Sequence, residues 1–165
     1  FKKNKITHLS GTASFVNKQT INVKSSKKLT LSAKNFIIAT GSSSMERPGI
    51  TVDEKKIVTS TGALSLSAVP KTMLVIGGGY IGLEMGSVWS RLGTKVTVVE
   101  KLDRIVPTMD GEIATEFMKS LEKQGIEFKL SHKVTSTKSG SSEVEVTIES
   151  LEDKKQIKEK YNDIK

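Results

Sequence analysis

Three glycines at a characteristic spacing are the first residues in this sequence whose types could do chemistry. Gly77, Gly79 and Gly82 follow an apolar run and precede an amphipathic segment. In such a turn the first glycine permits a tight bend, the second lets the backbone approach a pyrophosphate, and the third lets a helix pack closely on a strand. The N–H groups and the dipole at the start of that helix then bind the anion. The pattern predicts a dinucleotide-binding loop.

An acidic residue follows at the distance that such a loop requires. Glu100 ends the next apolar run and lies 18 positions after Gly82 (100 − 82), close to the roughly 20 expected for a dinucleotide fold. A carboxylate at this point accepts hydrogen bonds from the ribose 2′-OH and repels a 2′-phosphate, so it favours NAD. Lys101 and Arg104 leave NADP open as an alternative, but we interpret them as solvated surface cations.

The segments around the loop predict the elements that position it. We expect strands at residues 73–76 and 96–99 and, between them, a helix that ends at Gly93. The apolar residues of this helix repeat at helical spacing and are expected to form its buried face: Ile81, Met85, Val88 and Leu92. Strand, helix and strand in this order predict an α/β fold.

The second half of the chain predicts one more helix and several strands. Asp110 is the expected N-cap of the helix and Gly125 its C-terminal stop. Its apolar face is expected to contain Ile113, Phe117 and Leu121. Alternating apolar residues indicate strands at residues 126–134, at 144–148 and, unless this segment frays, at 157–161.

The N-terminal part predicts a different unit. Residues 14–31 alternate short apolar and polar runs, which is typical of a small β-meander. The apolar run at residues 36–39 predicts a strand that is buried on both faces. Residues 42–72 are expected to be a connection with one short helix, which begins near Ser60 and ends near Leu66.

Composition excludes several kinds of chemistry. The 165 residues contain no cysteine, which excludes disulfides and thiol chemistry within them, and no metal-ligand spacing emerges. The longest apolar run, residues 73–83, is too short to span a bilayer, and the start of the chain does not resemble a signal peptide. The lack of an initiator Met suggests a fragment.

The net charge of +8 is concentrated in the N-terminal part, since residues 1–45 hold eight lysines and no acid. Nucleic-acid binding is one interpretation of this asymmetry. Arginine is missing from the lysine-rich part, however, so we prefer the interpretation that these residues belong to a larger domain whose acidic residues lie elsewhere.

Three stretches together resemble the dihydrolipoyl dehydrogenase family of pyridine nucleotide-disulfide oxidoreductases. They are residues 37–42, residues 60–64, and residues 77–91 with Glu100. The resemblance implies two nested nucleotide domains. Residues 1–44 would be the tail of an FAD-binding domain, made of the β-meander and a terminal strand. Residues 45–165 would be a Rossmann-type, three-layer NAD-binding domain with a β-meander, lacking its last parallel strand.

The resemblance also implies which residues contact each cofactor. NAD would be bound by Gly77, Gly78, Gly79, Tyr80, Ile81, Gly82, Glu84, Glu100 and, on the adenine side, Val134. FAD would lie against Ala13, Thr40, Gly41 and Ser42 in the full-length protein. Glu84 would lie beside the nicotinamide and the flavin and pair with a lysine of the FAD-binding domain. Gly11-Thr12-Ala13 stands where the family usually has Gly-x-Gly.

The implied reaction passes electrons from dihydrolipoamide to a disulfide, then to FAD, and finally as hydride to NAD⁺. The family's redox cysteines and its His/Glu pair lie outside this chain, so the fragment alone is expected to be inactive. We keep two alternatives: a non-catalytic NAD-binding module, and another disulfide reductase such as glutathione or mercuric reductase.

Partners and location follow from the same resemblance. The implied partners are the missing portions of the same polypeptide, a second copy in a homodimer, and 2-oxo acid dehydrogenase complexes. We expect no nucleic acid, no membrane and no metal. The expected location is the cytoplasm of a bacterium or the mitochondrial matrix of a eukaryote, and we prefer the bacterial cytoplasm.

Overall fold

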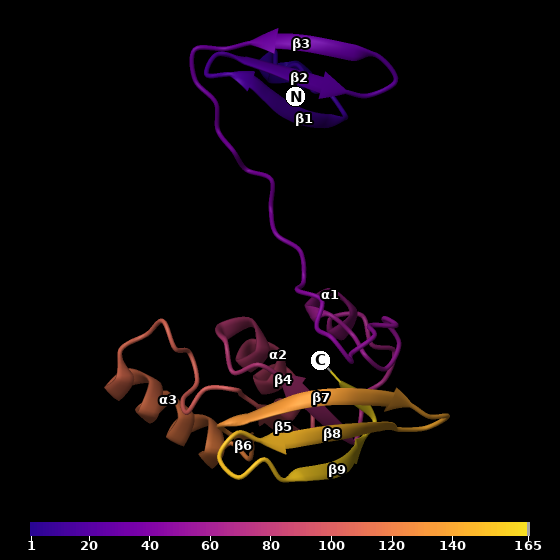
Figure 1. The fold of residues 1–165 in the computed structure, drawn as a ribbon, viewed down its shortest axis with the longest axis vertical. Helices are drawn as coiled ribbons and strands as arrows, with labels where there is room; N and C mark the ends of the chain where they lie inside the picture. The colour runs from indigo at the N-terminus through magenta and orange to yellow at the C-terminus, as the bar shows by residue number, and fades with distance from the viewer. Residues whose placement is uncertain (165) are drawn as a thin grey trace. The chain divides into compact units, whose positions relative to one another are not determined.

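The computed structural model describes residues 1–164, which divide into two compact units between Ser43 and Ser44. The first unit contains a short 3₁₀ helix η1 (Lys2–Asn4) and the strands β1 (Thr12–Asn17), β2 (Thr20–Lys24) and β3 (Lys28–Ser32). These strands pair antiparallel in the order β1-β2-β3, which confirms the predicted meander (Figure 1). Among its described residues, Val23 is the only buried hydrophobic side chain.

The predicted strand at residues 36–39, the terminal strand of the first unit, is wrong. This segment forms no strand, and Ile37 and Ile38 are 93% and 73% exposed. The ring of Phe36 instead contacts that of Phe15 edge-on, with 5.1 Å between the ring centroids. A central strand needs neighbouring strands for its backbone hydrogen bonds. Within residues 1–164, no strand pairs with this segment.

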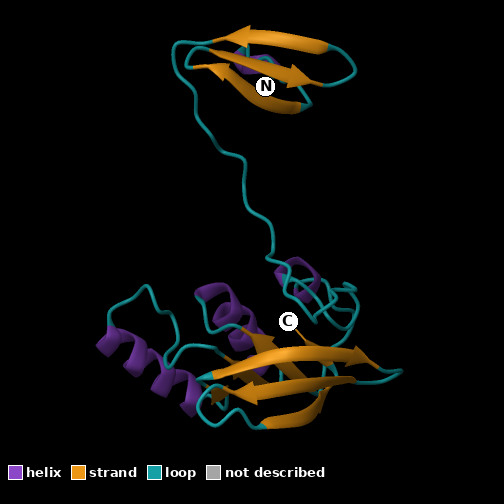
Figure 2. Cartoon of the chain, viewed as in Figure 1, coloured by secondary structure: helices purple, strands orange, loops and turns teal. Residues whose placement is uncertain are grey.

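The second unit has the predicted Rossmann-type three layers (Figure 2). Its central layer is a parallel sheet in the order β10-β4-β5-β6. The strands are β4 (Thr72–Ile76), β5 (Lys95–Val99), β6 (Glu127–Lys129) and β10 (Asp163–Ile164). The helices α2 (Tyr80–Arg91) and α3 (Gly111–Lys123) form a second layer. The third layer is an antiparallel sheet of β7 (His132–Ser139), β8 (Val144–Ser150) and β9 (Gln156–Tyr161), so the pairing alternative for residues 157–161 is confirmed.

The parallel strands are apolar on both faces because each face meets a different layer. Met73 and Val75 of β4 pack in a cluster with the helices, whereas Leu74 between them packs in a second cluster with the antiparallel sheet. In β5, Val98 and Val99 divide in the same way. The side chains of these five residues are at most 2% exposed. This double burial explains the continuous apolar runs in the sequence.

The predicted buried faces of both helices are largely wrong. In α2 the buried residues are Leu83, Gly86 and Trp89. The exposed residues of the predicted stripe are Ile81 (48%), Val88 (47%) and Leu92 (56%). In α3, Ala114 and Leu121 are buried, whereas Ile113 and Phe117 are exposed. Each helix carries apolar residues on two sides, so helical spacing alone could not identify the side that meets the sheet.

Two predictions about strands also need correction: the extent of one strand and the absence of another. The expected strand at 126–134 is two strands in different sheets, because Ser131 has a left-handed φ of 53° and turns the chain between β6 and β7. The NAD-binding domain was predicted to lack its last parallel strand. However, β10 lies parallel on β4, with Ile164 beside Leu74 and 1% exposed. This strand has only two described residues, too few to produce a periodic signal.

The connection that precedes β4 is more ordered than its polar sequence suggested. It contains the short helix α1 (Ser60–Ala63), close to the predicted position. Before α1, Ile57 lies parallel beside Ile164, and the N–H of Val58 donates to the carbonyl oxygen of Ile164 over 2.8 Å. Asp53 organises this segment, because its carboxylate accepts the N–H groups of Lys55, Lys56 and Ile57 at 2.8–2.9 Å. The edge of the parallel sheet is therefore covered by the connection.

Asp53 leads to a prediction about stability and pH. Burial would raise the pKa of this carboxyl, but the three N–H donors outweigh burial and hold the pKa below its ordinary value. We expect Asp53→Ala to lower the free energy of unfolding by about 1–2 kcal/mol at pH 7. Because the folded pKa is depressed, the difference from the wild type should persist above about pH 4 and vanish as the pH falls further.

Urea unfolding of the wild type and of Asp53→Ala at pH 7 and pH 3 measures this difference. Asp53→Asn is the matched control, since it keeps an acceptor oxygen without the charge and should lose only part of the stability. An equal wild-type advantage at both pH values would contradict the assigned role of the carboxylate.

Candidate functional site

The glycine loop connects β4 to α2 at the carboxyl end of the parallel strands. Gly77 has a φ of +111°, which disfavours residues with a side chain, and its N–H donates to the carbonyl oxygen of Val99 over 2.9 Å. Gly79 is the N-cap of α2, and a Cβ added there would meet no atom within 4 Å. The backbone at Gly79 therefore borders open space, as a loop that receives a ligand requires.

The third glycine of the pattern is needed for packing. A Cβ on Gly82 would overlap the carbonyl oxygen of Gly77 and lie 3.1 Å from Val75 Cγ1. One turn later, a Cβ on Gly86 would lie 3.3 Å from Val96 Cγ1. Both glycines let α2 approach the sheet closely. Gly79 and Gly82 thus differ physically, because the first faces open space and the second faces backbone.

Glu100 extends from the end of β5 back to the glycine loop. One carboxylate oxygen, Oε2, accepts the N–H of Gly78 over 2.6 Å, and the other, Oε1, accepts the N–H of Leu102 over 2.8 Å. Each carboxylate oxygen can accept more than one hydrogen bond, so capacity remains for two ribose hydroxyls. Glu100, which the sequence spacing predicted to act together with the glycine loop, is therefore hydrogen-bonded directly to that loop.

The backbone of Glu100 is held by a corner that sequence reasoning missed. Its N–H donates to the carbonyl oxygen of Lys129, and its own carbonyl oxygen accepts the N–H of His132, both over 3.0 Å. Between these residues, the N–H of Ser131 donates to the carbonyl oxygen of Leu102 over 2.9 Å. No residue-type signal marks this corner, because its turn depends on a left-handed serine rather than a glycine.

Arg104 and Lys101 are the two cations that kept NADP as an alternative. The guanidinium of Arg104 donates to the carbonyl oxygen of Pro107 over 2.8 Å, and a Cβ on Gly111 would lie 3.4 Å from Arg104 Nη1. Arg104 thus fastens the loop between β5 and α3, while Lys101 is exposed. This arrangement agrees with the interpretation of both as surface residues.

Of the remaining residues assigned to NAD, three lie on α2 and one, Val134, lies on β7. Tyr80 and Glu84 are exposed on its first two turns. Ile81 lines a cavity of about 240 Å³, together with Ile76 at the end of β4 and Thr59 just before α1. Val134 is partly buried against the cluster that contains Val99, two residues after the His132 that bonds to Glu100. Val134 therefore shares a cluster with Ile76 and Val99, the last residues of β4 and β5.

The residues assigned to FAD lie in the first unit. Ala13 and Thr40, distant in sequence, line the same groove of about 300 Å³, whose walls include Phe15, Phe36 and Ile38. Gly41 and Ser42 follow directly, and Gly41 has a φ of +74° with no atom within 4 Å of an added Cβ. An apolar groove with exposed backbone at one end fits a flat ring system better than a charged ligand.

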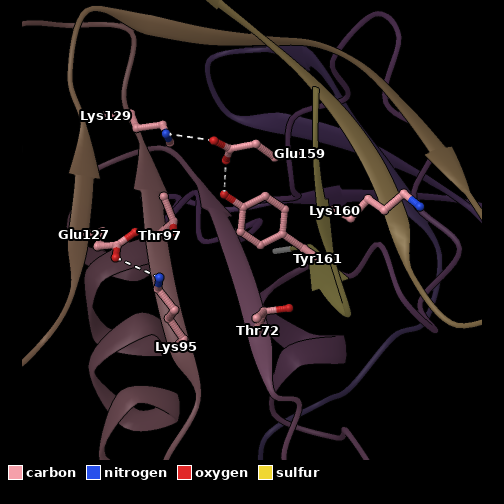
Figure 3. A pocket seen from close by; sticks show the side chains of 8 residues that line it. All are labelled: Thr72, Lys95, Thr97, Glu127, Lys129, Glu159, Lys160 and Tyr161. Atoms are coloured by element: carbon pink, nitrogen blue, oxygen red, sulfur yellow. Dashed lines mark hydrogen bonds and ion pairs between the residues drawn. The ribbon is translucent and has the colours of Figure 1, made fainter. Parts of the chain in front are cut away.

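A further cavity in the second unit is lined by polar residues and has a volume of about 340 Å³ (Figure 3). It is lined by strands of both sheets, and the first residue of each of three parallel strands lines it. These are Thr72, Lys95 and Glu127, and the other lining residues are Thr97, Lys129, Glu159, Lys160 and Tyr161. Within residues 1–164, no group of three or more His, Asp or Glu side chains is placed to hold a metal ion. In that same range, no helix is long and apolar enough to cross a membrane.

Comparison with known proteins places these features in a family. Residues 1–161 match the family described as pyridine nucleotide-disulphide oxidoreductase. The mitochondrial dihydrolipoyl dehydrogenase of Schizosaccharomyces pombe is 55% identical over 158 residues, which cover 94% of this chain and 31% of that protein. A leghemoglobin reductase of Glycine max is 51% identical over 151 residues, 90% of this chain and 29% of that protein. The chain thus spans about a third of the length of such relatives.

Solved structures agree on the fold. The HOCl-induced flavoprotein disulfide reductase RclA of Escherichia coli matches 94% of this chain and 34% of its own, with a TM-score of 0.70 and 27% identity. LpdA of Mycobacterium tuberculosis matches with a TM-score of 0.75 over 94% of this chain and 35% of its own, and at 20% identity it shows the fold alone.

The contrast between two glycines of the loop can be tested by substitution. Gly82→Ala should lower the free energy of unfolding by about 1–3 kcal/mol, because the new Cβ meets backbone that has no room to move. Gly79→Ala should cost less than about 1 kcal/mol, because it meets open space and replaces only a glycine N-cap. Chemical unfolding of both variants measures the difference. Equal stability would refute the assigned packing role of Gly82.

Proposed function

The chain belongs to the pyridine nucleotide-disulphide oxidoreductase family, and from this premise we propose that it is the central, NAD-binding part of a flavin-dependent dihydrolipoyl dehydrogenase. The observation that carries the proposal is the hydrogen bond of 2.6 Å between the Glu100 carboxylate and the N–H of Gly78. It joins the ribose-selective acid to a glycine loop at a helix N-terminus. The names of two dihydrolipoyl dehydrogenases at 54–55% identity supply the substrate, dihydrolipoamide.

In this proposal the residues at the carboxyl edge of the parallel sheet orient the dinucleotide. The loop of Gly77, Gly78, Gly79, Tyr80, Ile81 and Gly82 holds the pyrophosphate. Glu100 accepts hydrogen bonds from the ribose, and Val134 borders the adenine. Bound NAD⁺ supplies the hydride acceptor for the reduced flavin. The protein's contribution in this part of the chain is to position the cofactor.

The exposed side of α2 supports a flavin-side role for Glu84. Ile81, Val88 and Leu92 are each about half exposed on that side, and Glu84 lies between them on the same exposed surface. Such an apolar stripe in water indicates a surface that another part of the polypeptide covers. The relatives are about three times longer than this chain, so the covering part is available. We assign Glu84 to the nicotinamide and flavin side and expect its lysine partner in the covering part.

For FAD, we propose that the groove of the first unit contributes backbone contacts in the longer protein. Ala13 and Thr40 line the groove, and Gly41 and Ser42 continue from its end. Because the 165 residues contain no cysteine, the redox disulfide must come from the rest of the polypeptide, and the chain alone should not oxidise dihydrolipoamide. The proposed partners are a second copy in a homodimer and 2-oxo acid dehydrogenase complexes.

The names of the relatives also bear on location. The dihydrolipoyl dehydrogenases of Schizosaccharomyces pombe, Arabidopsis thaliana and Pisum sativum are all named as mitochondrial. We therefore propose the mitochondrial matrix rather than the bacterial cytoplasm that we preferred from the sequence.

A chimera tests the enzymatic part of the proposal. Residues 1–161 replace the matching segment of the Schizosaccharomyces pombe enzyme, and reduction of NAD⁺ by dihydrolipoamide is measured after FAD loading. We expect an active chimera, and expect the same chimera with Gly79→Val to bind FAD but not reduce NAD⁺. A folded, FAD-loaded chimera without activity, beside an active parent, would favour the non-catalytic NAD-binding module instead.

The choice of dinucleotide yields a separate prediction. Glu100→Gln removes the charge that favours ribose hydroxyls and repels a 2′-phosphate. We expect the NAD dissociation constant of the 165-residue chain to rise about tenfold or more, because hydrogen bonds to a charged group contribute about 1.5–3 kcal/mol. Affinity for NADP should stay equal or increase. Isothermal titration calorimetry with both dinucleotides measures these values.

Arg104→Gln is the control for the competing assignment. Because Arg104 bonds to the carbonyl oxygen of Pro107, its loss should leave the ratio of NAD to NADP affinity unchanged within about twofold. Unchanged NAD affinity in Glu100→Gln would show that the carboxylate does not bind the ribose.

A further inference from the structure

We propose that Lys129, Glu159 and Tyr161 form a positioning network that holds Glu100 in place for dinucleotide selection. The three residues lie outside the glycine loop, and their side chains line the polar cavity between the parallel sheet and β9 (Figure 3). The inference rests on the proposed function, because it concerns the residue proposed to bind the ribose. It assigns a role to side chains that the sequence analysis did not single out.

The strand β6 makes few backbone pairs within its sheet, and on its other face Phe128 packs against the core cluster beside the helices. This strand has three residues and lies at the edge of the parallel sheet, so within residues 1–164 β5 is its single neighbouring strand. Only three residue pairs define that contact, and the last is Lys129 beside Val99. An edge strand this short frays unless side chains fasten it.

Lys129 is also the residue whose backbone holds Glu100. Its carbonyl oxygen accepts the N–H of Glu100 over 3.0 Å, and three residues later the N–H of His132 donates to the Glu100 carbonyl oxygen over 3.0 Å. The backbone of Glu100 is therefore bonded on both sides to the segment that begins at Lys129. A shift of Lys129 would move Glu100 and, through it, the carboxylate beside Gly78.

The side chain of Lys129 fixes that position against another layer. Its Nζ donates to Glu159 Oε1 over 3.0 Å, and the Tyr161 hydroxyl donates to Glu159 Oε2 over 2.5 Å. Glu159 and Tyr161 belong to β9 of the antiparallel sheet, so the network joins two sheets. Figure 3 shows the three side chains converging from the facing strands.

Burial makes this network stiffer than an ordinary surface ion pair. The side chains of Lys129 and Glu159 are 28% and 31% exposed, and Tyr161 is buried. Burial would raise the pKa of Glu159, but the hydrogen bonds from Tyr161 and Lys129 outweigh it and keep the pKa below its ordinary value. Burial and the bond to Glu159 raise the pKa of Tyr161. At neutral pH the carboxylate is thus ionised and the hydroxyl remains a donor.

The same two strands provide a matched control. Lys95 of β5 pairs with Glu127 of β6 over the same 3.0 Å, but the side chains are 64% and 55% exposed. This pair fastens the first residue of β6 rather than the last, and exposed pairs contribute little. Loss of Lys95 removes an ion pair of equal length from the same cavity. It leaves the hydrogen bonds of Lys129, Glu159 and Tyr161 in place, although the charge of Lys95 also acts on the Glu159 carboxylate.

A double-mutant cycle tests the network in the 165-residue chain. NAD and NADP dissociation constants are measured for the wild type, Lys129→Met, Glu100→Gln and the double variant. We expect Lys129→Met to weaken NAD binding about 3–10-fold and to reduce the ratio of NAD to NADP affinity, because a displaced carboxylate loses its geometry. The double variant should bind NAD as weakly as Glu100→Gln alone, since coupled residues are not additive.

Two further variants separate positioning from general stability. Lys95→Met should leave NAD affinity unchanged within about twofold, and Lys129→Arg should restore most of the affinity lost in Lys129→Met. Tyr161→Phe removes a single hydroxyl and serves as the test if Lys129→Met does not fold. It should shift the affinity ratio in the same direction by a smaller factor. Amide hydrogen exchange at Glu100 and His132 should be faster in Lys129→Met and Tyr161→Phe than in Lys95→Met.

The outcomes of these measurements distinguish a failure of the proposed function from a failure of the positioning role. If the wild-type chain does not bind NAD, the proposed function fails and the positioning role fails with it. If NAD binds but Lys129→Met and Glu100→Gln are additive, or Lys129→Met lowers stability without changing the affinity ratio, the positioning role is refuted and the proposed function stands.

Discussion

The parallel pairing of β4 with β5 is the constraint on which the candidate site depends. The register sets Ile76 beside Val99, so the residues that follow, Gly77 and Glu100, leave the sheet at the same edge. The N–H of Gly77 extends the ladder by one bond to Val99, and the Glu100 carboxylate then reaches Gly78. A slip of one residue would exchange the side chains of the slipped strand between the two apolar clusters. Core packing thereby enforces the geometry of the loop and the acid.

The sequence was sufficient to predict these elements because their signals are local. Gly77, Gly79 and Gly82 mark a turn whose backbone requirements few other residues meet, and the continuous apolar strands on either side indicate burial on both faces. The position of Glu100 follows from the lengths of one helix and one strand. The three layers follow in turn, because a strand that is apolar on both faces needs a cover on each.

Other features depend on contacts that no local pattern encodes. Both sides of α2 carry apolar residues, and the side that meets the sheet is selected by Gly82 and Gly86, which allow close approach, rather than by the larger stripe. Residues 36–39 have the composition of a central strand, but a strand forms only where neighbours supply hydrogen bonds. The corner at Ser131 requires a left-handed serine, which is a consequence of the contacts of Glu100 and not a preference of serine.

The second unit has an apolar core of its own, whereas the first unit has almost none. The proposed NAD site lies in the second unit and the proposed FAD groove in the first. The second unit encloses two apolar clusters, and the residues assigned to NAD, from Gly77 to Val134, all lie within it. The first unit buries only Val23 among its described hydrophobic residues, while Phe15 and Ile37 remain exposed. Burial of apolar surface is the main favourable term in folding. The proposed flavin groove would therefore need surface supplied by the rest of a longer polypeptide, whereas the proposed selection of NAD by Glu100 would use contacts that this chain already contains.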